Sequence, residues 1–241
     1  MKVLVLGGTG EAHALCLELW EAGVDFLHSR AGILENPMPL PYPHRDGGFG
    51  GADGLAAFVS AGKFSHIVLA THPFAKQIAG NARRAAAMTG LPLREIQRAP
   101  WAQPPGAIWH PFDKLDELAD ALPRRARVFL TIGRKRLDVF SRRADLWFLY
   151  RAIEPSGVPL DGIEIIARPP FDLTGEIALM REYRIDCLVT RNSGGEATRA
   201  KIDAAAQLGV PVFLLQHEEI GEAVAPSDVR SVLDWLLKQV P

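Results

Sequence analysis

CLVTRNSGGEATRAKIDAAAQLGVPV, residues 187–212, contains one complete structural unit from which the fold can be inferred. It opens with four residues typical of one buried strand, and a glycine-bearing turn follows them. Ser193 and Glu196 have the spacing of a capping box, so we expect a helix to begin there and to end at Gly209. The apolar run over 210–215 predicts the next strand, which completes a strand–turn–helix–strand unit of an α/β fold.

The turn of this unit lies at the carboxyl end of a strand, where parallel sheets bind their ligands. Backbone N–H groups and the positive end of the helix dipole converge there, and Arg191 adds a full charge. The turn can therefore hold a phosphate or a carboxylate. A tight, well-capped turn that binds nothing fits the same residues, and the turn alone does not decide between the two.

Composition limits the class of protein. The 241 residues are 48% hydrophobic and 23% charged, with a formal net charge of -1. We therefore expect a globular protein without strong attraction to nucleic acid or membrane, and no apolar run reaches the roughly 18 residues of a membrane helix. The chain opens on a strand, and Cys16 and Cys187 lie in apolar patterns, so we expect a cytoplasmic protein. The seven histidines show no metal-ligand spacing, and no metal site is expected.

The first residues predict a βαβ unit. A strand over 2–6 is followed by Gly7-Gly8-Thr9-Gly10, a helix over 11–20 and a second strand over 24–28. Gly8 and Gly10 match the dinucleotide fingerprint G-x-G-x-x-G, but His13 occupies the third glycine position. We expect this turn to hold a pyrophosphate through Gly8, Thr9 and Gly10.

The end of the second strand indicates which dinucleotide binds. An NAD site places an acidic residue there for the ribose hydroxyl, whereas this chain has Ser29 and Arg30. A hydroxyl and a guanidinium suit a 2′-phosphate, which favours NADP. A surface arginine that follows a strand is the alternative explanation.

Two further segments of the first half have candidate ligand residues. The proline-rich, irregular stretch over 31–51 ends in GGFGG, where Gly50 would let the backbone approach a ligand, and Asp53 is expected to cap the next helix. A buried strand over 65–70 ends in Thr71 and His72. His72 faces the expected cofactor crevice as a catalytic residue, although a structural histidine is equally consistent, and a helix is expected over 74–88.

The second half repeats the alternation of strands and helices. Arg127 to Ile132 predicts a strand, and the basic turn Gly133-Arg134-Lys135-Arg136 follows it. Further strands are expected over 147–153, 162–167 and 186–190, and helices over 113–123, 174–183 and 228–239. The fold class is thus α/β, with two Rossmann-like parallel-sheet domains, 1–106 and 107–241, that face an interdomain cleft.

Several motifs occur together in one order. They are Gly7–Ala12 (GGTGEA), Ser29 with Ala31-Gly32, Gly47–Gly51 (GGFGG), Thr71–Ala75 (THPFA), Leu130–Arg134 (LTIGR) and Arg191–Thr198 (RNSGGEAT). Over residues 2–216 the chain resembles the precorrin-6A reductase family of cobalamin biosynthesis. The family often has Lys at position 191, Asp at 70 and Arg at 33, where this chain has Arg191, Ala70 and Ile33. The last difference leaves open which residue holds the 2′-phosphate.

The resemblance implies an activity and a set of ligands. It implies NADPH-dependent reduction of one double bond of precorrin-6A, an anionic tetrapyrrole, to give precorrin-6B. NADPH is then expected at Gly8, Thr9, Gly10, Ser29, Arg30, Gly50 and Thr71. The substrate is expected at Thr131, Arg134, Arg191, Asn192, Ser193 and Gly194.

Two other functions fit an α/β chain with glycine turns. A two-domain sugar-nucleotide glycosyltransferase would use similar turns, since fold does not decide function. A non-enzymatic NADP sensor would bind the cofactor without turnover. The partners expected are the tetrapyrrole alone, with no nucleic acid or membrane, in a monomer or a small homo-oligomer.

Overall fold

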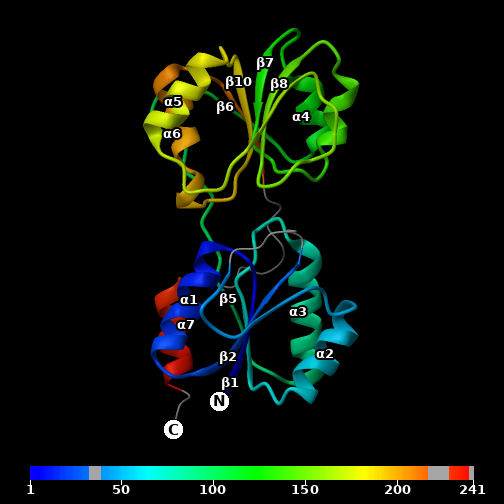
Figure 1. Cartoon of the computed structure of the whole chain (residues 1–241), viewed down its shortest axis with the longest axis vertical. Coiled ribbons are helices and arrows are strands. Elements are labelled where there is room, and N and C mark those ends of the chain that lie inside the picture. Colours follow the sequence, from blue (N-terminus) through cyan, green and yellow to red (C-terminus); the bar gives the residue numbers. More distant parts are fainter. Residues whose placement is uncertain (33–38, 217–227, 239–241) are drawn as a thin grey trace. The chain divides into compact units, whose positions relative to one another are not determined.

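The computed structural model describes residues 1–32, 39–216 and 228–238 (Figure 1). The chain forms two compact units. One consists of Met1–Ala99 together with the end of the chain from Ile220, and the other of Pro100–Glu219. Each has its own parallel sheet with helices on both faces, so the expected class of two Rossmann-like α/β domains is confirmed. The expected cleft between them stays a prediction.

The first unit is built on a five-stranded sheet of order β3-β2-β1-β4-β5 in which every neighbouring pair is parallel. The strands are β1 (Lys2–Leu6), β2 (Asp25–Arg30), β3 (His44–Asp46), β4 (His66–Leu69) and β5 (Leu93–Glu95). One face is covered by α1 (Gly10–Glu21) and α7 (Val229–Leu237), the other by α2 (Gly51–Ala61) and α3 (Lys76–Thr89) (Figure 1). The strands β1 and β4 are buried on both faces, which explains their continuous apolar runs.

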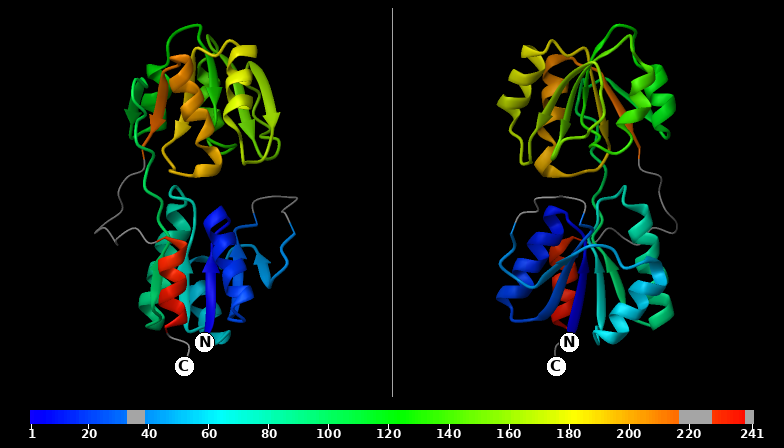
Figure 2. Two further views of the ribbon diagram at one scale, coloured as in Figure 1. Left: turned by 90° about the vertical axis from the view of Figure 1, so that its left-hand side faces the viewer. Right: turned by 45° about the vertical axis from the view of Figure 1, so that its right-hand side comes forward.

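The second unit has a six-stranded parallel sheet of order β6-β11-β10-β7-β8-β9. Its strands are β6 (Trp109–Phe112), β7 (Arg127–Leu130), β8 (Trp147–Ala152), β9 (Gly162–Ile166), β10 (Cys187–Arg191) and β11 (Val212–Leu215). The helices α5 (Leu173–Glu182) and α6 (Ala200–Leu208) cover one face (Figure 2). The other face is covered by α4 (Leu115–Ala121) and the 3-10 helix η1 (Leu137–Arg142).

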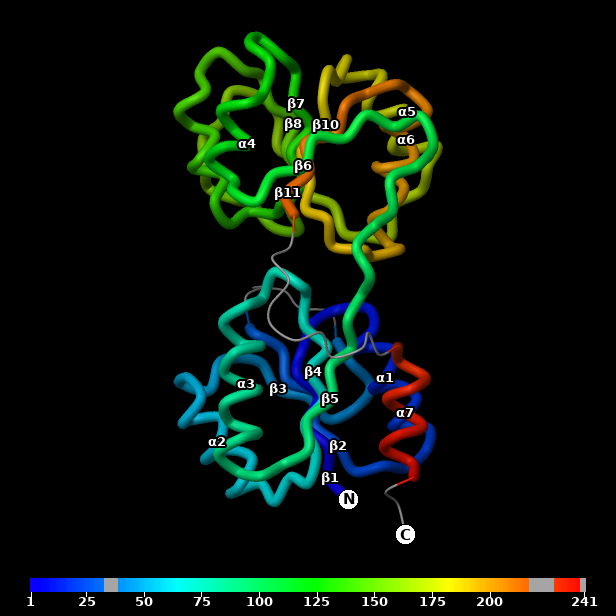
Figure 3. Tube along the Cα trace, turned by 180° about the vertical axis from the view of Figure 1, so that it is seen from behind, coloured from blue at the N-terminus to red at the C-terminus, as the bar shows by residue number. Residues whose placement is uncertain are grey.

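The terminal helix α7 belongs to the first unit, which differs from the expected contiguous domains 1–106 and 107–241. It runs beside α1, as the view from behind shows (Figure 3). Val232, Leu233 and Leu236 are buried there in the core that α1 forms with β1 and β2. Burial of these side chains assigns α7 to the first unit. Apolar area removed from water stabilises that unit wherever the residues lie in the chain.

Three expected helix starts are wrong. The capping box at Ser193 does not form, because the Ser193 N–H bonds the Arg191 carbonyl and Gly194 is left-handed at φ +67°. The chain turns before it can coil, and α6 begins only at Ala200 after the 3-10 turn η2 (Glu196–Thr198). Likewise α2 is preceded by left-handed Gly50, with Asp53 inside its first turn, and α3 begins at Lys76.

Two short strands were not expected. The strand β3 lies inside the proline-rich stretch over 31–51, and β6 precedes α4. Each is an edge strand, β3 beside β2 and β6 beside β11. Edge strands of this length lack the apolar run by which buried strands are identified in a sequence.

Candidate functional site

Each sheet reverses its strand order at one point, where ligands of α/β proteins bind. In the first unit the chain proceeds outward from β1 to β3 and then returns to β4, so the reversal lies between β1 and β4. In the second it lies between β7 and β10. Four of the turns predicted from the sequence follow these strands: those at Gly8, Thr71, Thr131 and Asn192. Ser29 and Arg30 instead end the neighbouring strand β2, and Gly50 precedes α2.

Thr9 ties the two turns of the first unit together. Its Oγ1 donates to the Ala70 carbonyl at the end of β4, at 2.8 Å, and accepts from the Ala12 N–H at 3.2 Å as the cap of α1. One hydroxyl thus joins the β1 turn to β4 and also begins the helix. An uncapped N-terminal turn would leave these backbone donors without a partner.

Gly7 is required by the close approach of two strands, whereas Gly8 and Gly10 leave open space in front of the backbone. A Cβ at Gly7, whose φ is +150°, would lie 2.0 Å from the Ala70 carbonyl oxygen, so only glycine lets β1 and β4 approach this closely. A Cβ at Gly8 or Gly10 would meet nothing within 4 Å. The backbone there faces open space at the start of α1, which is the arrangement that admits a pyrophosphate.

The end of β2 has an acid that the sequence did not reveal. Arg30 and Asp46 are partners across β2 and β3, and Arg30 donates two hydrogen bonds to Asp46, at 2.7 and 2.8 Å. The hydrogen bond from Arg30 is the main reason why the pKa of Asp46 is lowered. Asp46 is not detectable at sequence level because β3 has no strand pattern. Ile33, the departure from the family pattern, lies outside the described residues.

A second arginine stands beside Ser29. Arg45 donates to the Ser29 hydroxyl at 3.0 Å and to the carbonyls of Gly47 and Gly48 at 3.1 Å each. Its guanidinium lies 4.3 Å from the centre of the Phe49 ring. Arg45 was missed for the same reason as Asp46, and it places a second cation beside the 2′-phosphate position expected from Ser29.

His72 and Thr71 follow β4 directly, as expected. The His72 Nδ1 accepts from the Phe74 N–H at 3.3 Å, and its carbonyl accepts from the Ala75 N–H at 2.8 Å. The ring therefore helps to shape the turn before α3. Because Nδ1 accepts this bond, the proton of the neutral ring lies on Nε2.

Glu11 is a further residue that the sequence reasoning did not single out. It lies in the first turn of α1, where its carboxylate would repel a phosphate, and Arg98 donates to both of its oxygens. Burial raises the pKa of Glu11, but the hydrogen bonds and charge of Arg98 lower it further, so the net shift is downward. Arg98 thus neutralises a charge at the expected pyrophosphate turn.

In the second unit the β7 and β10 turns are joined in a similar way. The Thr131 N–H and Oγ1 both donate to the Val189 carbonyl, at 2.9 and 3.1 Å. Arg134 and Arg191 belong to these two turns, and Arg134 lies 3.5 Å from the Glu154 carboxylate. Burial, and then the charge of Arg136, lower the pKa of Arg191. A partly desolvated cation beside another favours an anionic ligand.

The Asn192 side chain is occupied within the fold. Its Oδ1 accepts from the Trp101 N–H at 2.8 Å and its Nδ2 donates to Gln216 at 3.1 Å. Asn192 thus fixes the segment that enters the second unit and the end of β11. Its side chain supports the turn, and the Ser193 N–H is occupied by the Arg191 carbonyl. An anion at this turn would therefore meet the Gly194 N–H or the Ser193 hydroxyl.

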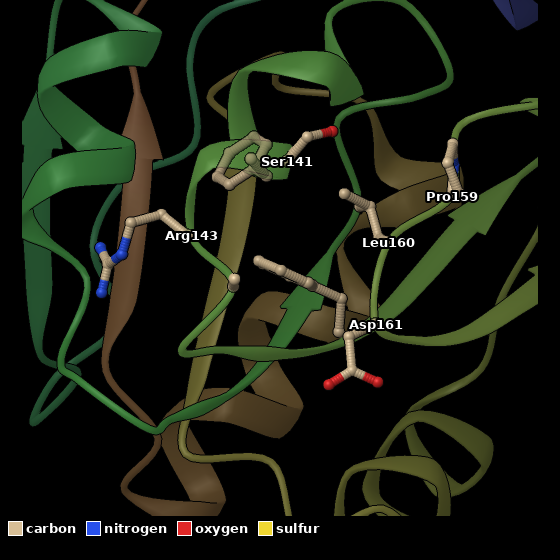
Figure 4. Close-up of a pocket in the computed structure, with 8 residues that line it drawn as sticks. Ser141, Arg143, Pro159, Leu160 and Asp161 are labelled. Carbon is tan, nitrogen blue, oxygen red and sulfur yellow. The ribbon is translucent and has the colours of Figure 1, made fainter.

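One cavity of the second unit lies away from these turns. It measures about 350 Å³ and is lined by segments that precede β8 and β9, at the sheet edge opposite the turns (Figure 4). The Arg143 side chain turns away from the other labelled residues and bonds Asp145 and backbone carbonyls. This cavity is therefore not part of the candidate site.

None of the helices in 1–32, 39–216 and 228–238 is long and apolar enough to cross a membrane. In the same ranges, no group of three or more His, Cys, Asp or Glu side chains is arranged to hold a metal ion.

Comparison with known proteins adds a family. The model of the precorrin-6x reductase CbiJ/CobK family matches residues 2–237. A precorrin-6A reductase of Rhodococcus erythropolis is 46% identical over 98% of this chain and 97% of its own, and that of Rhodobacter capsulatus is 38% identical over 98% and 95%. The solved structure of CobK precorrin-6A reductase, 38% identical, superposes with a TM-score of 0.93 over 99% of this chain and 96% of that one. The family model and these relatives extend over nearly the whole chain, which therefore belongs to the precorrin-6x reductase CbiJ/CobK family.

Proposed function

We propose that this chain reduces precorrin-6A to precorrin-6B in cobalamin biosynthesis, with NADPH as the reductant. Family membership favours this over a sugar-nucleotide glycosyltransferase. The structural observation that carries it is the Gly7–Gly10 turn, tied to β4 by Thr9 and open in front of Gly8 and Gly10. A nicotinamide dinucleotide bound there would supply the hydride.

The cofactor residues of this proposal all lie on the first unit. Backbone N–H groups of the Gly8-Thr9-Gly10 turn hold the pyrophosphate, and Gly50 and Thr71 border it. Ser29 and Arg30 at the end of β2, with Arg45 on the neighbouring β3, provide the hydroxyl and cations that suit a 2′-phosphate. The preference for NADPH over NADH rests on these three residues.

The substrate residues lie on the second unit. Precorrin-6A has several carboxylates, and the β7 and β10 turns provide Arg134, Arg191, the Ser193 hydroxyl and the Gly194 N–H to bind them. Thr131 holds the two turns together through its bonds to Val189. Orientation of the ring carbon against the nicotinamide is the main contribution of the protein.

Reduction of a double bond requires a proton as well as a hydride. His72 is the proposed donor from Nε2, since Nδ1 is occupied by the Phe74 N–H. We expect His72→Ala to lower kcat about 10²-fold, with little change in the KM for NADPH. His72→Asn is the matched control for the shape of the turn, since its amide oxygen can accept the Phe74 bond. Unchanged kcat in His72→Ala would assign the proton to solvent.

One experiment tests the activity itself. Purified chain, NADPH deuterated at C4 and precorrin-6A are mixed, nicotinamide absorbance is followed, and the product is weighed by mass spectrometry. We expect absorbance to fall and one deuterium and one solvent hydrogen to appear in the product. Cofactor binding without loss of absorbance would instead show an NADP sensor. Product without deuterium, from either C4 label, would show that hydride transfer is not direct.

A further inference from the structure

His28 lies on β2 directly behind the glycine turn of the first unit. It is 2% exposed, and its Nε2 is 2.5 Å from the Gly7 carbonyl oxygen. The Gly7 N–H donates to the Ser29 carbonyl at 3.0 Å, so neighbouring residues of β2 hold both backbone polar groups of Gly7. The conformation of this one residue is therefore fixed from the strand beside it.

The contact determines where the His28 proton is. A carbonyl oxygen can only accept, so Nε2 must carry the hydrogen. Nδ1 then has a lone pair, and it is buried without a hydrogen-bond partner in the described part of the chain. Burial, the largest influence, lowers the pKa of His28 and keeps the ring neutral. An unpartnered buried nitrogen destabilises the folded chain, whereas a phenylalanine would carry no such nitrogen. Packing alone does not account for a histidine here.

Holding the Gly7 carbonyl also orients the next N–H group. The Gly7–Gly8 peptide is planar and trans, so its carbonyl and its N–H point in opposite directions. Because the carbonyl points at His28, the Gly8 N–H points away from β2. No described residue accepts from the Gly8 N–H, and the space beside Gly8 is open. This donor is thus oriented before any ligand arrives.

We propose that His28 is a positioning residue, which aims the Gly8 N–H at the anionic group of the bound cofactor by fixing the Gly7 carbonyl. The inference rests on the proposed function, in which this turn holds the pyrophosphate. It adds a residue that touches neither cofactor nor substrate and that no glycine fingerprint contains. Pre-oriented donors bind more tightly because no rotation has to be arrested on binding.

The test is NADPH titration of the full chain, followed by nicotinamide fluorescence, in three variants. We expect His28→Phe to raise the Kd about tenfold and to raise the KM for NADPH without lowering kcat. His28→Gln, whose side-chain amide can donate to the Gly7 carbonyl, should recover most of the affinity. His66→Phe is the matched control, because His66 is also buried but lies at the opposite end of β4, bonded to Ser65 and packed on Trp235. The Kd of the His66→Phe variant for NADPH should not change.

Nitrogen-15 NMR of the ligand-free chain gives a readout that does not depend on binding. It should show His28 neutral with the proton on Nε2, and His28→Phe should shift the Gly8 amide resonance. A proton on Nδ1, or a folded His28→Phe with normal affinity for NADPH, would overturn the role of His28 alone. Failure of the unmodified chain to bind NADPH would instead overturn the proposed function.

Discussion

Asp46 is the residue whose charge opposes the proposed cofactor preference. Its carboxylate stands at the end of β3 and holds the Arg30 guanidinium with two hydrogen bonds. A 2′-phosphate would have to share Arg30 with this carboxylate and would be repelled by it. Arg45, engaged with the Ser29 hydroxyl and neutral carbonyls, has no such competing anion among its described partners.

Asp46→Asn should therefore tighten NADPH and leave NADH unchanged. The amide removes the repulsion and weakens the attraction of position 46 for Arg30, and we expect the Kd for NADPH to fall roughly three- to tenfold. Titration of the variant with each cofactor measures this change in Kd, and NADH acts as the internal control. An equal change for both cofactors would place the 2′-phosphate away from Asp46.

The sequence predicted the residues at the strand ends but not their tertiary partners. Gly8, Thr9, Ser29 and Thr131 lie at the strand ends that the motifs indicated, because buried parallel strands have a strong apolar pattern. The sequence did not predict which side chains these and neighbouring strand-end residues contact. Asp46 approaches Arg30 through pairing of β2 with an unpatterned edge strand, and such a contact depends on tertiary structure that no local spacing encodes.

At the scale of elements, the approach of β1 to β4 depends on one missing side chain. Gly7→Ala would put a methyl group 2.0 Å from the Ala70 carbonyl oxygen, and the two strands would have to separate. We expect a loss of at least about 2 kcal/mol in the free energy of unfolding, measured by urea denaturation. Gly8→Ala is the matched control. Its methyl group meets open space, so stability should stay within about 0.5 kcal/mol while NADPH binding weakens.

A buried charge joins three elements of the second unit. Lys201 on α6 lies in a cluster with Glu176 on α5 and Arg151 on β8, and Arg151 donates to Glu176 at 2.6 Å. Burial lowers the pKa of Lys201 to about 7, and Arg151 reinforces this against the opposing effect of Glu176. The folded chain thus releases a proton near neutral pH that the unfolded chain keeps to about pH 10.5.

The free energy of unfolding should consequently rise with pH above 7. The unfolded chain then binds more protons than the folded one, with a slope of at most about 1.4 kcal/mol per pH unit. Chemical denaturation from pH 7 to about 7.5 tests this. At higher pH the thiols of Cys16 and Cys187, whose pKa burial raises to about 12, oppose the slope because they ionise first in the unfolded chain. Lys201→Met should flatten the slope, whereas exposed Lys114→Met should retain it. A slope that survives in Lys201→Met would assign it to another group.

The positions of most helices and strands were predictable from the sequence, but the first residues of several helices and the short edge strands were not. Continuous apolar runs identified β1, β4, β7 and β10 because these strands are buried on both faces. The start of α6 depended instead on the left-handed Gly194 and the tight bond from Ser193 to Arg191, which a capping-box spacing does not reveal.

On the scale of the whole molecule, the first unit is discontinuous. Its core contains Leu236, which is fully buried against α1 although the second unit intervenes in sequence. The amphipathic pattern of α7 predicted a helix with a core face, but it could not indicate which core. Tertiary contacts decide which unit a terminal helix packs against. Because α7 follows the second unit in sequence, we expected it there, whereas it packs in the first.

Leu236→Ala should therefore weaken the first unit. We expect a loss of about 2–4 kcal/mol in the stability of that unit, with a higher Kd for NADPH near its melting temperature. Leu237, 39% exposed on the same helix, provides the control, because Leu237→Ala removes less buried area than Leu236→Ala. Calorimetry on the full chain should show one transition shifted and one unchanged. A shift of the second transition instead would place α7 with residues 100–219.

The discontinuity also sets an order of events on the ribosome. Residues 1–99 emerge first, yet their unit lacks the helix that covers α1 until the last residues of the chain have been synthesised. The second unit is continuous in sequence and can complete its sheet while the ribosome is still translating. The half of the protein that is made first is thus finished last, and until then the apolar face of α1 is a place where chaperones would engage the nascent chain.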